Sequence, residues 1–300
     1  MRKKRISSTT RTSSKIKGGH GDHSLKHPPL KSIKFIGLSL GGGKTTKSCL
    51  TVIEYFPLEN KVFLRHLFEN ISRSQEMTSD EWLMETIKEV SKSSHSLYVN
   101  VPVQLPVCLR CRLKCPGVER CRQKEVQWLR DQYSEINKKL KPKRVLTPYT
   151  ERCVDYFVTH LLEEKFDPGH GLGSNLAPLT ARWQFLQKQT SLPVIEVFTK
   201  AALWRIGRSL GVSKNLLRFH KHAIDGREAR SKILDSLIKR DTAFLYVQDI
   251  RLMIDNSHAF DAFVCGMTGL LNYKKQCEPR PKNYPKLAQW MALPKENIEW

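Results

Sequence analysis

Three mostly apolar runs follow one another early in the chain: IKFIGLSL from Ile33, SCLTVIEYF from Ser48 and VFLRHLF from Val62. Each run is rich in the β-branched and aromatic residues that suit a pleated surface. Short connections, GGGKTTK and PLENK, separate the runs. The pattern predicts three consecutive strands that pair as an antiparallel meander.

Helical spacing begins after the third run. In TSDEWLMETIKEV the apolar residues recur at helical intervals, with Thr78 or Ser79 as the N-cap. LYVNVPV and LPVIEVFTK are nearly continuous apolar runs, as expected of strands buried on both faces, and FLYVQD is a shorter strand candidate. Further helices are predicted in ALWRIGRSLG, closed by Gly211, in REARSKILDSLIKR and in SHAFDAFVCGMTGLLNYKKQ. This order predicts an α/β domain with a mixed central sheet flanked by helices.

Two segments depart from this pattern. Residues 104–190 hold a cysteine cluster and a charged helix around 119–140, and are interpreted as a Cys-rich, mostly helical insertion. Residues 1–31 are rich in Ser, Thr, Gly and Lys and offer almost nothing to bury, so a disordered basic tail is predicted. The remaining residues, 32–300, are predicted to form one domain.

The charge of the chain points to a polyanionic partner. There are 51 Lys and Arg against 29 Asp and Glu, a net charge of +22. Residues 1–31 hold nine of the bases and one acid, which leaves 42 bases and 28 acids for residues 32–300. The folded part is therefore basic by itself, and nucleic acid is the expected partner. The alternative is a solvated basic surface without a polyanionic partner.

The location expected from the sequence is the cytoplasm. There is no run of 18 or more apolar residues, so no membrane span or membrane partner is predicted. The basic N-terminus is not followed by an apolar core, so no secretory signal is predicted either.

The Gly-rich connection SLGGGKTT does not fit a P-loop. Counting back from Gly43, Lys44 and Thr45 places the first glycine of that motif at Leu38. A P-loop also runs into a helix, whereas a strand-like run follows here. A tight hairpin is the better interpretation. Lys44 and the loop N–H groups are nevertheless candidates for contact with a nucleic-acid phosphate.

Four of the eight cysteines fall within fourteen residues: Cys108, Cys111, Cys115 and Cys121. Without a predicted secretory signal, a thiolate metal site is favoured over disulfides. Four thiolates suit tetrahedral Zn²⁺, the favoured interpretation, or an iron–sulfur cluster. Neighbouring Arg and Lys residues would offset the thiolate charge. The alternative is four reduced thiols under a loop, or a redox pair.

Seven stretches carry a family resemblance over residues 33–295: IGLSLGGGKT, YVNVPVQLP, CLRCRLKCPGVERC, TPYTERCVDYF, LGSNLAPLTARWQFL, PVIEVFTKAALWRIG and FDAFVCGMTGLL. They are similar to an uncharacterised domain family predicted to be RNase H-fold nucleases. The resemblance implies an RNase H-like fold and metal-dependent phosphodiester hydrolysis. In that reaction two Mg²⁺ or Mn²⁺ ions, about 4 Å apart, clamp the attacking and leaving oxygens.

The family pattern places acids in the first, fourth and fifth strands and in the final helix. By this resemblance, the corresponding catalytic positions here are Ser39, Asn100, Glu196 and Asp261. Serine and asparagine offer a metal an oxygen but do not offset its charge. Thr199 and Lys200 stand where the family has a Pro-Glu step. Two-metal catalysis is therefore expected to be weak or lost, as in a pseudoenzyme.

The two acids that remain have structural alternatives. Glu196 lies in an apolar strand, so it is either functional, the favoured interpretation, or paired with an arginine. Asp261 begins an apolar helix and would also suit the helix dipole. Arg152 and Asp155 are expected either to contact the same cleft or to pair across one helical turn. Arg152 and Lys200 are thus candidates for nucleic-acid contact.

Three functions follow from these alternatives. The first is an active Mg²⁺- or Mn²⁺-dependent nuclease that uses Glu196 and Asp261, with missing charge supplied by another acid: Glu54, Asp155, Asp249 or Asp255. The second is an eroded RNase H-like scaffold that binds nucleic acid. The third is an actin-like ATPase relative, which ranks last because the acids and glycines of its second phosphate loop are not evident.

Overall fold

The computed structural model describes residues 32–42, 47–71, 76–92, 94–139, 141–166, 171–173, 176–222 and 225–300. Contacts group Lys31–Trp300 into one compact unit. The predicted tail, residues 1–31, and Lys44 lie outside the described residues. The unit is an α/β structure with a six-stranded mixed sheet, in the order β5-β4-β1-β2-β3-β6.

The centre of the sheet is the predicted antiparallel meander. It consists of β1 (Ile33–Ser39), β2 (Ser48–Phe56) and β3 (Lys61–Ile71). On one side of the meander, β4 (Ser94–Val99) runs parallel to β1 and β5 (Val194–Glu196) runs parallel to β4. On the other side, the two-residue β6 (Ala243–Phe244) runs parallel to β3. After β1 the chain continues into the strand β2 and not into a helix, as the hairpin interpretation requires.

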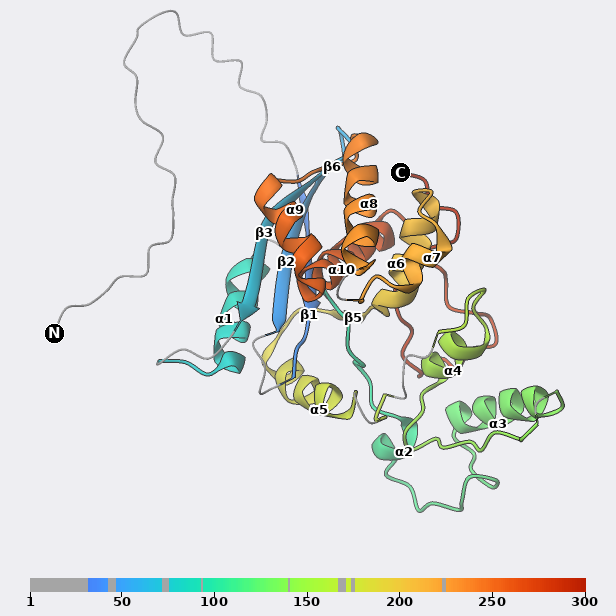
Figure 1. Cartoon of the computed structure of the whole chain (residues 1–300). Helices are drawn as coiled ribbons and strands as arrows, with labels where there is room; N and C mark the ends of the chain where they lie inside the picture. The colour runs from blue at the N-terminus through green and yellow to red at the C-terminus, as the bar shows by residue number, and fades with distance from the viewer. Residues whose placement is uncertain are drawn as a thin grey trace, which may run out of the picture. The chain divides into compact units, whose positions relative to one another are not determined.

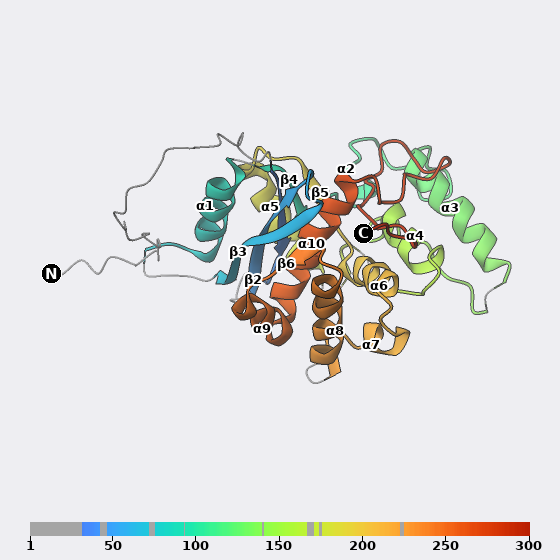
Figure 2. The same cartoon turned by 90° about the horizontal axis from the view of Figure 1, so that it is seen from above.

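Helices cover both faces of the sheet (Figure 1). One face packs on α1 (Ser79–Ser91) and α5 (Ala177–Leu186) around Ile36, Leu83 and Trp183. The other face packs on four helices around Phe35, Ile53 and Phe260: α6 (Thr199–Ser209), α8 (Asp225–Lys239), α9 (Val247–Asp255) and α10 (Ser257–Tyr273). The view from above shows these layers edge-on (Figure 2).

The segment between β4 and β5 contains most of the remaining helices. These are α2 (Val107–Arg110), α3 (Lys124–Asn137), α4 (Cys153–His160), α5 and the 3-10 turn η1 (Gln187–Gln189), while α7 (Lys214–Arg218) follows α6. Helices α3 and α4 pack on the C-terminal segment through Tyr133, Tyr156 and Tyr284. Figure 2 shows α2, α3 and α4 gathered beyond the β5 edge. None of the described helices is both long and apolar enough to cross a membrane.

Several predicted boundaries were wrong. The apolar run around β4 continues to Val103, but the strand ends at Val99 because the chain leaves the sheet at Asn100. The run around β5 gives only three strand residues before α6 begins. FLYVQD is not a strand: β6 ends at Phe244, and α9 starts at Val247. Two predicted helix ends were confirmed: Thr78 caps α1, and Gly211 adopts φ +83° after α6.

Helix α10 lies directly on the meander. A Cβ atom at Gly37 would lie 2.1 Å from the carbonyl oxygen of Ala262 and 2.4 Å from the amide nitrogen of Gly266. The Thr51 hydroxyl donates to the same Ala262 carbonyl at 2.9 Å. Glycine at position 37 therefore lets β1 touch the α10 backbone, which fixes the start of α10 beside the carboxyl end of β1.

Candidate functional site

The carboxyl ends of three parallel strands meet at one edge of the sheet. Leu38 of β1 pairs with Val99 of β4, and Val99 pairs with Glu196 of β5. A cavity of about 560 Å³ opens at this level, and we call it the cleft. Its polar lining includes Asn100, Arg152, Asp155, Glu196, Thr199, Lys200, Lys221 and His258. Strand ends of this kind are the usual place for ligands in open α/β sheets.

The Glu196 carboxylate is clamped by Arg152. Nη1 and Nη2 of Arg152 donate to its two oxygens at 2.7 and 2.8 Å, which is a bidentate ion pair. The Val103 backbone N–H adds a third hydrogen bond at 2.9 Å. The Arg152 and Glu196 side chains are both only 7% exposed. Glu196 is thus ion-paired with an arginine, the structural alternative that the sequence had ranked second.

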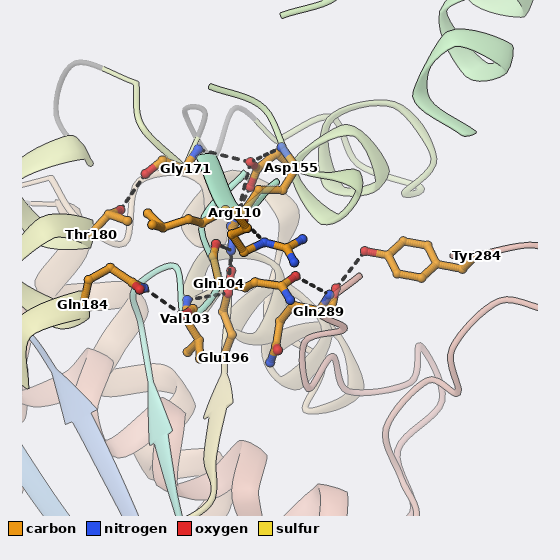
Figure 3. A network of polar contacts seen from close by, with 12 residues as sticks. Val103, Gln104, Arg110, Asp155, Gly171, Thr180, Gln184, Glu196, Tyr284 and Gln289 are labelled. Atoms are coloured by element: carbon orange, nitrogen blue, oxygen red, sulfur yellow. Dashed lines mark hydrogen bonds and ion pairs between the residues drawn. The ribbon is translucent and has the colours of Figure 1, made fainter. Parts of the chain in front are cut away.

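Asp155 binds donors of the same Arg152 guanidinium. It accepts from Nε of Arg152 at 3.1 Å and from Nη2 at 2.6 Å. Its side chain also accepts the Arg152 backbone N–H at the start of α4 and the Gly171 N–H. Figure 3 shows Asp155, Gly171, Val103 and Glu196 in this network. The end of β5, the segment after β4, the start of α4 and the loop at Gly171 are therefore joined through one ion triad of Arg152, Asp155 and Glu196.

No N–H of Arg152 is left for a ligand. Four of its five side-chain donors bind the two carboxylates, and Nη1 also reaches the Gln104 carbonyl at 3.5 Å. Burial lowers the pKa of Arg152, but the charges of Asp155 and Glu196 outweigh it and raise the pKa overall. Arg152 therefore keeps its positive charge, which interacts with the buried carboxylates of Asp155 and Glu196. All side-chain donors of Arg152 are thus bound inside the chain, and its contact with nucleic acid stays a prediction.

Two positions where the resemblance expects acids form a neutral hydrogen-bonded chain. Nδ2 of Asn100 donates to the Ser39 hydroxyl at 2.9 Å, while Oδ1 of Asn100 accepts from the Leu40 N–H. The Ser39 oxygen lies 3.3 Å from Nδ1 of His258, and burial lowers the pKa of that imidazole. Which of these two atoms donates depends on the tautomer of the His258 ring.

Asp261 of α10 is paired with a lysine. Nζ of Lys221 lies 2.8 Å from Oδ2, and the Asp261 side chain is only 2% exposed. The charge of Asp261 raises the pKa of Lys221, so the amine stays protonated. Oδ1 of Asp261 has no hydrogen-bond partner among the described residues. The carboxylate lies behind Lys221, which itself lines the cleft.

The structure thus brings together most of the residues predicted for the site. Asn100, Glu196 and Lys200 line the cleft, and Ser39 and Asp261 contact its lining residues. Of the alternative acids, Asp155 lines the cleft but is bound by Arg152. Asp255 pairs with Arg227 on the surface, and the Glu54 side chain accepts from Ser32 at the far end of β1. The cleft therefore gathers no set of unpaired carboxylates among the described residues.

Sequence reasoning missed Lys221 and His258. Lys221 follows the short helix α7, and His258 opens α10, with its N–H bonded to the Asn256 side chain. His258 had one available signal, since it precedes Asp261 by three positions and so shares a helix face with it. Lys221 had none, because its loop meets α10 only in the folded chain.

The cleft also receives a helix N-terminus. The first turn of α6 contains Thr199 and Lys200, and both residues line the cavity. No side-chain cap is found for α6 within the described residues. Its first N–H groups and partial positive charge therefore face toward the cleft, beside the Lys200 amine.

The four clustered cysteines are free and line a second cavity of about 600 Å³. Among the residues that the structure describes, no three Cys, His, Asp or Glu side chains are grouped closely enough to hold a single metal ion. The structure therefore leaves the predicted zinc or iron–sulfur group, and the predicted Mg²⁺ or Mn²⁺ at the cleft, as hypotheses.

Beside the ion triad, Glu151 makes stability depend on pH. Burial, at 2% exposure, raises the pKa of Glu151 from its usual 4.5 to about 7, although Tyr133 donates a hydrogen bond to the carboxylate. The folded chain then holds a proton that the unfolded chain releases between these pH values. The unfolding free energy should therefore fall as pH rises from about 4.5 to about 7.

Glu151→Gln should remove about 2–3 kcal/mol of this fall. The test is urea unfolding of the variant and the wild type at pH 5 and pH 8. The difference in unfolding free energy between the two proteins is measured at each pH, and the two differences are compared. An unchanged difference would show that Glu151 does not hold a proton in the folded chain.

Comparison with known proteins gives no relative for this chain: no family model, curated protein or solved structure matches it. The function of the cleft therefore has to follow from the chemistry of its own residues. That chemistry consists of cations, helix N–H groups and neutral donors around carboxylates that are already paired.

Proposed function

We propose that the chain binds nucleic acid at the cleft and does not cleave it by a two-metal reaction. The observation that carries the proposal is the pairing of every carboxylate at the site. Both oxygens of Glu196 bind Arg152, and Asp261 binds Lys221. Two divalent ions need several carboxylates to neutralise them, and here each candidate carboxylate is already ion-paired within the chain, with Arg152 shared by Glu196 and Asp155.

The arrangement of strands supports an RNase H-like scaffold. A three-strand antiparallel meander lies beside β4 and β5, which run parallel to β1 on one side, as in a meander followed by further strands. Ser39, Asn100 and Glu196 then fall at the ends of adjacent strands. We infer that this is the site of a nuclease-like fold from which the metal ligands of the first and fourth strands are missing.

The groups that remain available at the cleft favour an anion. Lys200 is exposed in the first turn of α6, and the Lys221 side chain is 43% exposed. The open N–H groups of α6 add donors without adding negative charge. These groups suit phosphate oxygens, which accept hydrogen bonds and are attracted by lysine charge.

The size of the charge excess favours a polymer over a small anion. Residues 32–300 carry fourteen more basic than acidic residues, far more than the cleft itself holds. A long phosphate backbone would contact the cleft and the basic surface around it at once. Neutralising several phosphates releases counterions, which is the main source of sequence-independent affinity.

Replacing Lys200 with glutamine should weaken this binding and reduce its dependence on salt. Loss of one phosphate contact lowers the slope of log affinity against log salt by about 0.7–0.9. The measurement is fluorescence anisotropy of labelled single-stranded DNA and RNA oligonucleotides over a series of salt concentrations. The matched control is Lys239→Gln, which removes an exposed lysine at the C-terminal end of α8 that does not line the cleft.

The control should bind like the wild type. If wild-type affinity does not change with salt, or if Lys200→Gln and Lys239→Gln behave alike, phosphate contact at the cleft is wrong. If the wild type binds neither nucleic acid, the proposed function itself is wrong.

A further inference from the structure

The cysteine cluster forms a site of its own, separate from the cleft. Cys108, Cys111, Cys115 and Cys121 all line one cavity of about 600 Å³. No pair among them is joined as a disulfide.

The backbone around the cysteines is ordered by its own contacts. Cys108 lies in α2, and the Cys111 N–H donates to the Val107 carbonyl at 2.9 Å to end that helix. Gly117 turns the chain with φ +87°, and the Cys121 N–H donates to the Val118 carbonyl. One helix end and two turns thus shape the backbone that carries the cysteines before α3 begins.

The cavity is built to accept a charged, sulfur-bound group. Nε2 of Gln123 lies 3.7 Å from Sγ of Cys111, the distance of an N–H···S hydrogen bond. Lys114, Arg120 and Arg122 line the same cavity and would offset thiolate charge. Arg110 is bound by Glu125 through both carboxylate oxygens, so it anchors α2 to α3 instead.

We propose that the four cysteines hold an iron–sulfur cluster. A single zinc ion would draw four sulfurs to about 2.3 Å from one point. A cluster instead places iron and sulfide ions between the thiolates, so the sulfurs stand at the walls of a larger space. The four thiols line one cavity, but among the described residues no three of them are close enough to share a single ion, and a hydrogen-bond donor lies on one sulfur, which matches the second arrangement.

The cluster would brace the segment that leads into the cleft. Nε of Arg110 in α2 donates to the Leu105 carbonyl at 2.8 Å. One residue earlier, the Gln104 carbonyl contacts Arg152, and its side chain accepts the Gln289 N–H. Figure 3 shows Gln104 and Arg110 beside this network. The site is independent of the proposed nucleic-acid binding, but it lies on the same stretch of chain.

The test is the metal and sulfide content of the full chain, purified under nitrogen from cells grown with added iron. The expected result is two or four irons per chain with an equal number of acid-labile sulfides, a broad visible absorbance, and an electron paramagnetic resonance signal after reduction with dithionite. One zinc per chain without iron would overturn the proposal, and so would a chain without either metal.

Two variants separate a cluster from adventitious iron. Cys115→Ser changes the exposed member of the set and should lower iron and sulfide at least several-fold. Cys277→Ser is the control, because Cys277 is half-buried beside the Thr268 carbonyl and outside the cavity. Its iron and sulfide content should equal that of the wild type. Equal losses in both variants, or in neither, would contradict a cluster on these four cysteines.

Discussion

Replacing Arg152 with leucine is expected to lower the free energy of unfolding by about 3–5 kcal/mol. The substitution leaves Glu196 and Asp155 buried without the guanidinium that binds both of them. Breaking a buried pair is costly because the remaining charge stays in a poorly solvated place. Urea unfolding followed by circular dichroism measures the loss.

The matched control is Arg227→Leu on α8. Its ion pair with Asp255 is more than half exposed on both sides, so the loss should be at most about 1 kcal/mol. Arg152→Lys should fall between the two, since a lysine keeps the charge but cannot bind two carboxylates with a planar fork. Equal losses for Arg152→Leu and Arg227→Leu would show that the ion triad is not formed.

Replacing Gly37 with alanine should destabilise the chain by at least about 3 kcal/mol, because the added methyl group meets backbone on two sides. Its nearest atoms, the Ala262 carbonyl oxygen and the Gly266 nitrogen, belong to a long buried helix and cannot turn away as a side chain would. Helix α10 would have to move off the meander. Thermal unfolding and the soluble yield are the measurements.

Ile36→Val controls for a small change at the neighbouring position. Ile36 is fully buried on the opposite face of β1, and loss of one methylene there costs about 0.5–1.5 kcal/mol. A Gly37→Ala variant no less stable than Ile36→Val would mean that α10 does not lie against β1 as described.

The sequence predicted the three central strands of the sheet correctly, but it did not predict where the outer strands β4, β5 and β6 end. The three meander strands were predicted because β-branched and aromatic runs alternate with turn residues over short distances. The lengths of β4 and β5 were overestimated, because the runs continue as buried connections after the strands end. β6 was misread because FLYVQD contains both the last strand residue, Phe244, and the start of α9 at Val247.

The candidate site was predicted as a set of positions but not as a set of contacts. A carboxylate in the apolar run PVIEVF had to be functional or paired, and that much followed from burial alone. Its partner Arg152 is 44 positions away, so only the folded chain shows that the pairing took place. The same holds for Lys221 and Asp261, which are brought together by the turn between α7 and α8.

These pairings give the cleft a consistent chemistry. Glu196 and Asp261, the acids that a divalent ion would need, are each ion-paired with a cation of the chain. Ser39 and Asn100, at the positions in the first and fourth strands, form a hydrogen-bonded chain of neutral groups with His258. A metal ion would first have to displace Arg152 from a bidentate contact. A phosphate has no such barrier, because Lys200 and the start of α6 are accessible to it.

The most direct measurement is made on the wild-type chain with labelled single- and double-stranded DNA and RNA in Mn²⁺. Binding is followed by anisotropy, and strand integrity by gel electrophoresis of the same samples. We expect salt-dependent binding with every strand recovered intact. Cleavage by the chain that a chelator abolishes would contradict the claim that paired carboxylates leave this site without a two-metal reaction.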